Sequence, residues 1–184
     1  MSLRHALLGA LADQPRTGYA LLKHFEQSLG QAWPASHSQI YPELARLRGE
    51  GLIRETAAGA RGSRTYGLTE AGLDEVRRWL RGTEPDRRVR SDAALRVFFL
   101  WLLEPAEAEA FLERERAHLQ GRLERYERIR AEDPVLRTRK QRAFRLALEG
   151  GIRSLEARLA WIDWAAGEVG SRSWAERDAP ATVP

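Results

Sequence analysis

A single change of periodicity constrains this chain more than any other feature. Residues 52–56 (LIRET) and 64–68 (RTYGL) are short β-prone runs, and the loop AAGARGS between them contains two glycines. This pattern predicts two strands joined as a hairpin. On both sides of it, apolar residues recur at helical spacing. We therefore expect a mainly α protein with one hairpin in its first half.

Three helices are expected before the hairpin and one directly after it. Leu3, Leu7 and Leu11 share one helical face, and Thr17 is placed to cap the second helix after the turn DQPRTG. The expected helices are residues 2–12, 17–29, 36–50 and 69–82. The order helix, helix, helix, hairpin, helix is that of a winged helix-turn-helix with a two-stranded wing.

The third helix has signals at both ends. Ser36 followed by Gln39 is a capping-box pattern, and Gly51 suits a left-handed C-terminal cap. Pro42 leaves two alternatives open. Either the helix begins after Ser36 and is bent by a proline beyond its first turn, or it becomes regular only near Tyr41. In both cases its leading end carries short, exposed polar side chains.

The second half is patterned for helices throughout. We expect a winged domain over 1–84, a linker over 85–90, a helical dimerisation region over 91–170 and a flexible tail over 171–184. The run SDAALRVFFLWLL is apolar nearly all round, as in a helix enclosed by others. The last helix repeats apolar residues every three or four positions, as a coiled coil does, and would otherwise expose them. The residues that we assign to dimerisation are Leu148, Ile152, Leu155, Leu159 and Ile162.

Charge favours an anionic partner for the first half. Residues 1–90 hold 14 Lys and Arg against 10 Asp and Glu, whereas residues 91–184 hold 16 of each. The whole net charge of +4 therefore lies in the first half. A local excess of this kind steers toward a polyanion, although an ordinary basic surface fits the charge equally well.

Other classes of protein receive no support from the sequence. The chain has no cysteine, and no apolar run approaches the roughly 20 residues that span a bilayer, so we expect a cytoplasmic, nucleoid-associated protein without membrane contact. The four histidines have no metal-binding spacing, and no phosphate-binding, dinucleotide-binding or nucleophile motif is present. We expect no enzyme, no metal and no cofactor.

Three segments of the first half resemble the PadR family of bacterial transcriptional regulators. They are LLGALADQPRTGYALLKHFE, SQIYPELARLRGEGLI and RTYGLTEAG, in that order. The second half is similar, by helical pattern and position, to the dimerisation region that follows in this family. The chain departs from the family at Arg48 and Gly49, where an acidic residue commonly follows the equivalent of Leu47. This departure makes the third helix more basic.

The resemblance implies a dimeric DNA-binding repressor that releases its operator when a small aromatic or lipophilic effector binds. Two symmetry-related third helices would fit a near-palindromic operator in double-stranded DNA, with half-sites about 34–36 Å apart. The main alternative is a winged helix that binds protein and not DNA. An exposed apolar patch at the leading end of the third helix would favour that alternative.

Candidate contact residues follow from the chemistry of the major groove. Hydroxyl, imidazole and amide groups bond to base edges, whereas arginine and tyrosine suit phosphates. Ser36, His37, Ser38 and Gln39 are expected near bases. Lys23, Tyr41, Arg46, Arg61, Ser63 and Arg64 are expected near the DNA backbone, those on the hairpin loop also near the minor groove. Two competing roles remain: Ser36 as an N-cap only, and Tyr41 packed beneath the wing.

Any effector pocket is expected at the aromatic residues of the second half. Phe98, Phe99 and Trp101 are the candidates, although aromatic side chains at such spacing serve more often as core or dimer interface.

Overall fold

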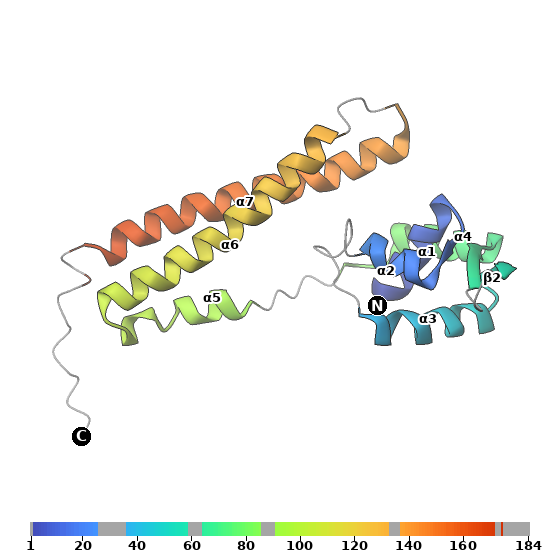
Figure 1. Ribbon diagram of the computed structural model, residues 1–184, viewed down its shortest axis with the longest axis horizontal. Coiled ribbons are helices and arrows are strands. Elements are labelled where there is room, and N and C mark those ends of the chain that lie inside the picture. The colour runs from blue at the N-terminus through green and yellow to red at the C-terminus, as the bar shows by residue number, and fades with distance from the viewer. Residues whose placement is uncertain are drawn as a thin grey trace, which may run out of the picture. The chain divides into compact units, whose positions relative to one another are not determined.

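The computed structural model describes residues 2–25, 36–58, 64–85, 91–132, 137–171 and 174. The chain forms two compact units, Met1–Arg87 and Arg88–Pro184, and each has its own hydrophobic core. Figure 1 shows a mainly helical protein with a small sheet in the first unit. The predicted fold class, a winged helix followed by a helical region, is confirmed.

The first unit contains four helices and three strands among its described residues. These are α1 (Ser2–Asp13), β1 (Arg16–Thr17), α2 (Gly18–His24), α3 (His37–Gly49), β2 (Ile53–Ala58), β3 (Arg64–Leu68) and α4 (Glu70–Gly82). Their core is built mainly from leucines of the first three helices, closed by Ile53 and Tyr66 from the sheet. Each fully buried leucine contributes about 1.5–3 kcal/mol through removal of its side chain from water.

The predicted hairpin is confirmed as β2 and β3, and the sheet has one further strand that was not predicted, in the order β1-β3-β2. Strand β1 pairs antiparallel with β3, with Arg16 opposite Tyr66 and Thr17 opposite Thr65. A strand of two residues shows no alternation, so the sequence DQPRTG indicated only a turn. Its pairing depends on β3, which lies far away in the sequence.

The end of α3 is joined tightly to the wing and to α4. Gly51 has a φ of +72°, and the Leu52 N–H donates to the Leu47 carbonyl at 3.0 Å, as in a Schellman cap. Thr69 caps α4, and its Oγ1 lies 2.8 Å from the carbonyl oxygen of Gly51. A Cβ on Gly72 would lie 2.1 Å from the Leu52 carbonyl oxygen, so only glycine fits there. This junction fixes the direction in which the hairpin leaves α3.

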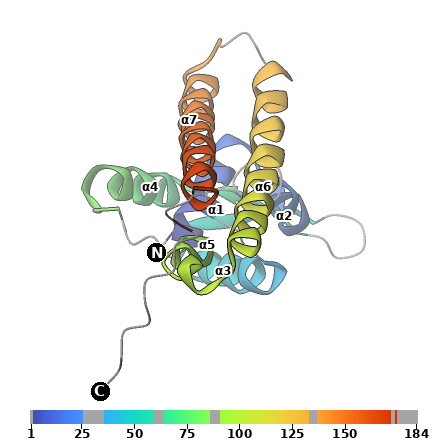
Figure 2. The same ribbon diagram turned by 90° about the vertical axis from the view of Figure 1, so that its left-hand side faces the viewer.

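The second unit is dominated by two long helices. Its elements are α5 (Asp92–Val97), the 3-10 turn η3 (Leu100–Leu102), α6 (Pro105–Glu132) and α7 (Arg139–Val169). Figures 1 and 2 show α6 and α7 side by side as an antiparallel pair. Buried Leu112, Leu119 and Leu123 of α6 pack in the same cluster as Ile152, Leu155 and Ile162 of α7.

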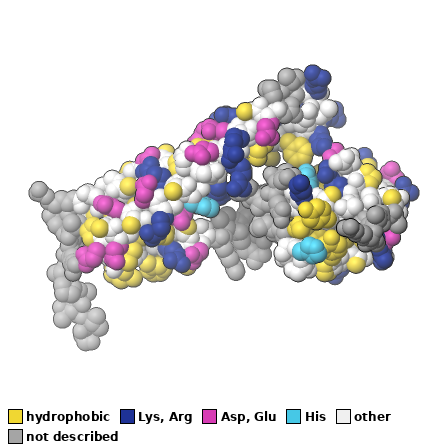
Figure 3. All heavy atoms as spheres, in the orientation of Figure 1, with side chains coloured by type: hydrophobic (Ala, Val, Ile, Leu, Met, Phe, Trp, Pro, Cys, Tyr) yellow, Lys and Arg dark blue, Asp and Glu magenta, His cyan; other side chains and the backbone are white. Residues whose placement is uncertain are grey.

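The segment after residue 91 is not the enclosed helix that its composition predicts. It forms the six-residue α5 and then η3, and Leu100 is the buried residue of the two elements. Figure 3 shows hydrophobic side chains gathered along the lower edge of this unit, over α5 and η3. A pair of helices can cover only one side of a third element, so its other side stays exposed in a single chain.

Among the described residues, no helix combines the length and the apolar character needed to cross a bilayer.

Candidate nucleic-acid interface

Helix α3 begins at His37, directly after Ser36, as the first of the two alternatives predicts. Ser36 is the N-cap, with extended backbone angles, and its N–H donates to Gln39 Oε1 at 3.0 Å. Ser36 Oγ lies 2.9 Å from Ser38 Oγ. The four residues of this leading end, 36–39, are all exposed. The helix therefore presents polar side chains together with the positive end of its dipole, which attracts anions.

Pro42 lies inside α3 and does not interrupt it. Because proline has no N–H, the Ser38 carbonyl lacks its usual helical donor. This carbonyl is an additional acceptor near the leading end of the helix.

Tyr41 packs against Gly18 at the start of α2. Its ring occupies the space in front of Gly18, where a Cβ would lie 2.7 Å from Tyr41 Cε1. The centroid of the His37 ring lies 4.4 Å from that of the Tyr41 ring. The residue keeps 38% of its surface exposed, so a phosphate contact by its hydroxyl stays a prediction.

The outer face of α3 carries only small side chains. Ser38, Pro42, Ala45 and Gly49 are exposed and recur at intervals of four, three and four residues. They lie opposite the buried face of Ile40, Leu44 and Leu47. A helix with such a face can approach another surface closely, because no long side chain holds it away.

Arg46 flanks this face and is weakly held. Its guanidinium lies 3.9 Å from Glu43 and 3.8 Å from Glu50, beyond hydrogen-bond distance, and its side chain is 67% exposed. Exposed pairs of this kind contribute about 0–1 kcal/mol. Glu50 is held instead by Arg4 of α1, and the hydrogen bond from Arg4 lowers the pKa of its carboxyl group. A phosphate could displace Arg46 from these weak contacts.

Glu55 at the wing was not among the predicted site residues. Arg64 is the first residue of β3, and its Nη1 donates to Glu55 Oε1 at 3.0 Å. Arg48, near the end of α3, donates to the same oxygen. The only signal in the sequence is the position of Glu55 two residues after Ile53, on the inward face of the strand. Arg61 and Ser63, the other wing candidates, lie outside the described residues.

On α2, the candidate Lys23 is exposed in the last turn. Tyr19 was not among the predicted contacts. It is exposed and directly follows Gly18, which touches Tyr41, so it lies at the end of α2 that adjoins α3.

Comparison with known proteins places this arrangement in a family. Residues 7–78 match the model of the transcriptional regulator PadR-like family. The chain is 35% identical over 137 residues to the negative transcriptional regulator PadR of Bacillus subtilis, an alignment that spans 70% of this chain and 75% of that protein. The chain belongs to the PadR-like family of transcriptional regulators.

Solved PadR structures show the same fold over nearly the whole chain. Bacillus subtilis PadR in complex with operator DNA matches with a TM-score of 0.81 and 26% identity, over 92% of this chain and 99% of that one. The complex of the same protein with p-coumaric acid matches with a TM-score of 0.79 and 25% identity, over 93% and 100%. Residues 89–169 also match the model of the virulence activator alpha C-terminal region.

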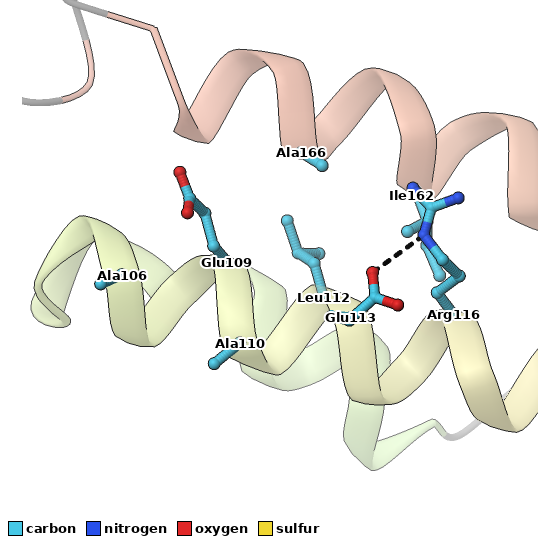
Figure 4. A pocket seen from close by; sticks show the side chains of 8 residues that line it. All are labelled: Ala106, Glu109, Ala110, Leu112, Glu113, Arg116, Ile162 and Ala166. Atoms are coloured by element: carbon cyan, nitrogen blue, oxygen red, sulfur yellow. Dashed lines mark ion pairs between the residues drawn. The ribbon is translucent and has the colours of Figure 1, made fainter.

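The predicted effector residues of this PadR-like protein are exposed in one chain, so an effector pocket at these positions stays a prediction. Phe98 is 76% exposed, Trp101 is 69% exposed and Phe99 is also exposed. One hollow in the described part of the second unit lies between the start of α6 and the end of α7, with a volume of about 390 Å³. Figure 4 shows alanine, larger apolar and charged side chains around it, with Glu113 paired to Arg116.

The seam assigned to dimerisation is covered within the chain. Ile152, Leu155 and Ile162 are buried in the cluster with α6, and Leu148 and Leu159 pack against it. The reason for assigning this seam to a dimer was that it would otherwise be exposed. That reason does not hold, because α6 supplies the cover. A dimer contact by these five residues stays a prediction.

Proposed function

We propose that this protein is a dimeric, sequence-specific DNA-binding repressor that a small effector releases from its operator. The observation that carries the proposal is the exposed polar leading end of α3. The outer face of α3 with its small residues continues from this end, and Arg64 is a basic residue of the wing. The likeness to Bacillus subtilis PadR, which was crystallised with operator DNA, supports DNA binding by this chain.

DNA binding is tested by fluorescence anisotropy with duplexes from the promoter region upstream of the gene. We expect tight binding to one near-palindromic segment and weak, salt-sensitive binding to a shuffled duplex. Arg46→Ala should weaken binding by about threefold to tenfold, the scale of one lost phosphate contact. Arg77→Ala is the matched control, because Arg77 is an exposed arginine on α4. Equal binding of both duplexes at all salt concentrations would argue against an operator reader.

The direction of regulation is inferred from the relatives. The Bacillus subtilis relative is described as a negative regulator, whereas the model matching residues 89–169 is named for an activator. We infer repression, because the first likeness spans both units. Deletion of the gene should raise transcription from the bound promoter. A fall in transcription would instead indicate an activator.

The dimer and the effector site are proposed at α5 and η3. Phe98, Phe99 and Trp101 form an apolar surface that one chain leaves open, and a second copy could cover it. The candidate effector class is a small aromatic acid, since p-coumaric acid is bound in one of the similar PadR structures. Addition of p-coumaric acid should quench tryptophan fluorescence and lower the affinity for the operator duplex. Retention of full DNA affinity at saturating p-coumaric acid would exclude this compound.

A further inference from the structure

One carboxylate connects the two elements that are proposed to contact DNA. Glu55 of β2 accepts hydrogen bonds at Oε1 from Arg48 of α3 and from Nη1 of Arg64 of β3, the latter at 3.0 Å. The side chains of all three residues are partly exposed, with 38% exposure for Glu55. Two guanidinium groups of the basic first half thus share a single acidic partner.

The sheet geometry explains why Glu55 reaches both arginines. Ile53 points into the core, so Glu55, two residues later, lies on the same face of the strand. Its partner across the ladder is Tyr66, and Arg64 lies two residues before Tyr66 on that same face. The register shifts between Glu55 and Ala57, at the end of the core. The carboxylate is therefore held at the edge of the core and turned toward α3.

The contacts keep this carboxylate negatively charged. The hydrogen bond from Arg48 lowers the pKa of Glu55, and the charge of Arg64 acts in the same direction. An ionised carboxylate only accepts hydrogen bonds, as a phosphate does. Glu55 and a DNA phosphate consequently compete for the same donors.

We propose that Glu55 is a positioning residue that holds Arg48 and Arg64 in the unbound protein and competes with DNA phosphates for both. The inference rests on the proposed DNA binding. It implies that the protein binds DNA more weakly, and with a smaller salt dependence, than its arginines alone would allow. Glu55 thereby sets how much of the affinity comes from the sequence-independent phosphate term.

The test is the variant Glu55→Gln, which keeps the shape of the side chain and removes its charge. Operator affinity is measured by anisotropy over a series of salt concentrations. We expect binding about threefold to tenfold tighter at low salt, the scale of two weak surface ion pairs. The slope of log affinity against log salt should steepen by up to about 0.9 for each arginine that gains a phosphate. A purely structural role for Glu55 would instead predict weaker binding.

The control Asp74→Asn removes an equal charge from an exposed pair with Arg77 on α4. It should change affinity less than twofold, and melting curves should show that both variants fold. In a variant that already carries Arg48→Ala and Arg64→Ala, Glu55→Gln should change the operator affinity no more than Asp74→Asn does.

Three outcomes overturn the inference. They are unchanged or weaker binding by Glu55→Gln, an equal gain in the background without the two arginines, and an equal gain from Asp74→Asn. If the wild-type protein bound no duplex at all, the proposed function would fail as well. If the wild-type protein binds DNA and Glu55→Gln binds it with the same affinity, this inference fails and the proposed function stands.

Discussion

Gly150 and Gly151 are neighbours in α7, but their surroundings differ. A Cβ on Gly151 would lie 2.4 Å from Cε2 of Tyr126 in α6, whereas a Cβ on Gly150 would meet nothing within 4 Å. Gly151 therefore permits the close approach of the two helices. Gly150 has no such role in the described structure and lowers helix stability by about 1 kcal/mol relative to alanine.

This difference predicts opposite effects of the same substitution at adjacent positions. Gly150→Ala should raise the free energy of unfolding by about 0.5–1 kcal/mol, because alanine favours the helix. Gly151→Ala should lower it by about 1–3 kcal/mol, because the new methyl group displaces the Tyr126 ring. Urea unfolding followed by circular dichroism measures both. Equal stabilisation by the two variants would show that the Tyr126 ring moves away without loss.

At the scale of one element, the outer face of α3 should tolerate only small side chains in the DNA complex. Ala45 is exposed in the middle of this face. Ala45→Leu should leave the melting temperature unchanged, because leucine is a good helix former. It should weaken operator binding at least tenfold, or about 1.4 kcal/mol, by holding the helix away from the base edges.

The matched control is Ala45→Ser, which adds one atom and should retain most of the affinity. Full binding by Ala45→Leu would mean that this face of α3 does not enter the groove.

A second prediction at this scale concerns the link between α1 and α3. The hydrogen bond from Arg4 lowers the pKa of Glu50, whose ordinary value is 4.5. A lowered folded-state pKa contributes stability above the unfolded-state pKa, and this contribution is lost as the pH falls through the folded-state value. Glu50→Gln should therefore melt below the wild type at pH 7. The difference should shrink as the pH drops below about 4.5.

A difference in melting temperature that stays constant from pH 7 to pH 3 would contradict this assignment. The control Asp92→Asn removes a carboxylate that pairs with Arg96 in the second unit.

At the scale of the whole molecule, each of the two units has a closed core of its own. A fragment of residues 1–87 should therefore unfold cooperatively by itself. It should bind one half-site more weakly than the full chain binds the operator, because the proposed dimer no longer links two DNA-binding units. Calorimetry tests the cooperative unfolding of the fragment, and anisotropy tests its binding to a half-site. A fragment without a cooperative transition would show that the first unit depends on the second.

The exposed aromatics of α5 and η3 lead to a prediction about assembly. Phe98→Ser combined with Trp101→Ser should shift the protein toward monomers in sedimentation experiments, because the proposed dimer loses apolar surface. Trp164→Ser removes another exposed tryptophan, on α7, and should leave the assembly unchanged. Dissociation by the control alone would place the interface on α7.

Much of the fold and part of the candidate site follow from local sequence signals. The capping role of Ser36, the left-handed Gly51, and the seam of Leu112, Leu119 and Leu123 depend on residues that are near neighbours in the sequence. The strands β2 and β3 are joined by one short loop. Such features are determined by hydrogen bonds between near neighbours and by the helical repeat. They can therefore be predicted from a single sequence.

Only the tertiary structure decided the contacts between distant segments. It paired β1 with β3, set Tyr41 against Gly18, and covered the seam of α7 with α6. Periodicity indicates that a face is apolar, but it does not indicate which partner covers that face. The partner depends on how packing the whole core brings remote elements together, and no local pattern encodes that choice.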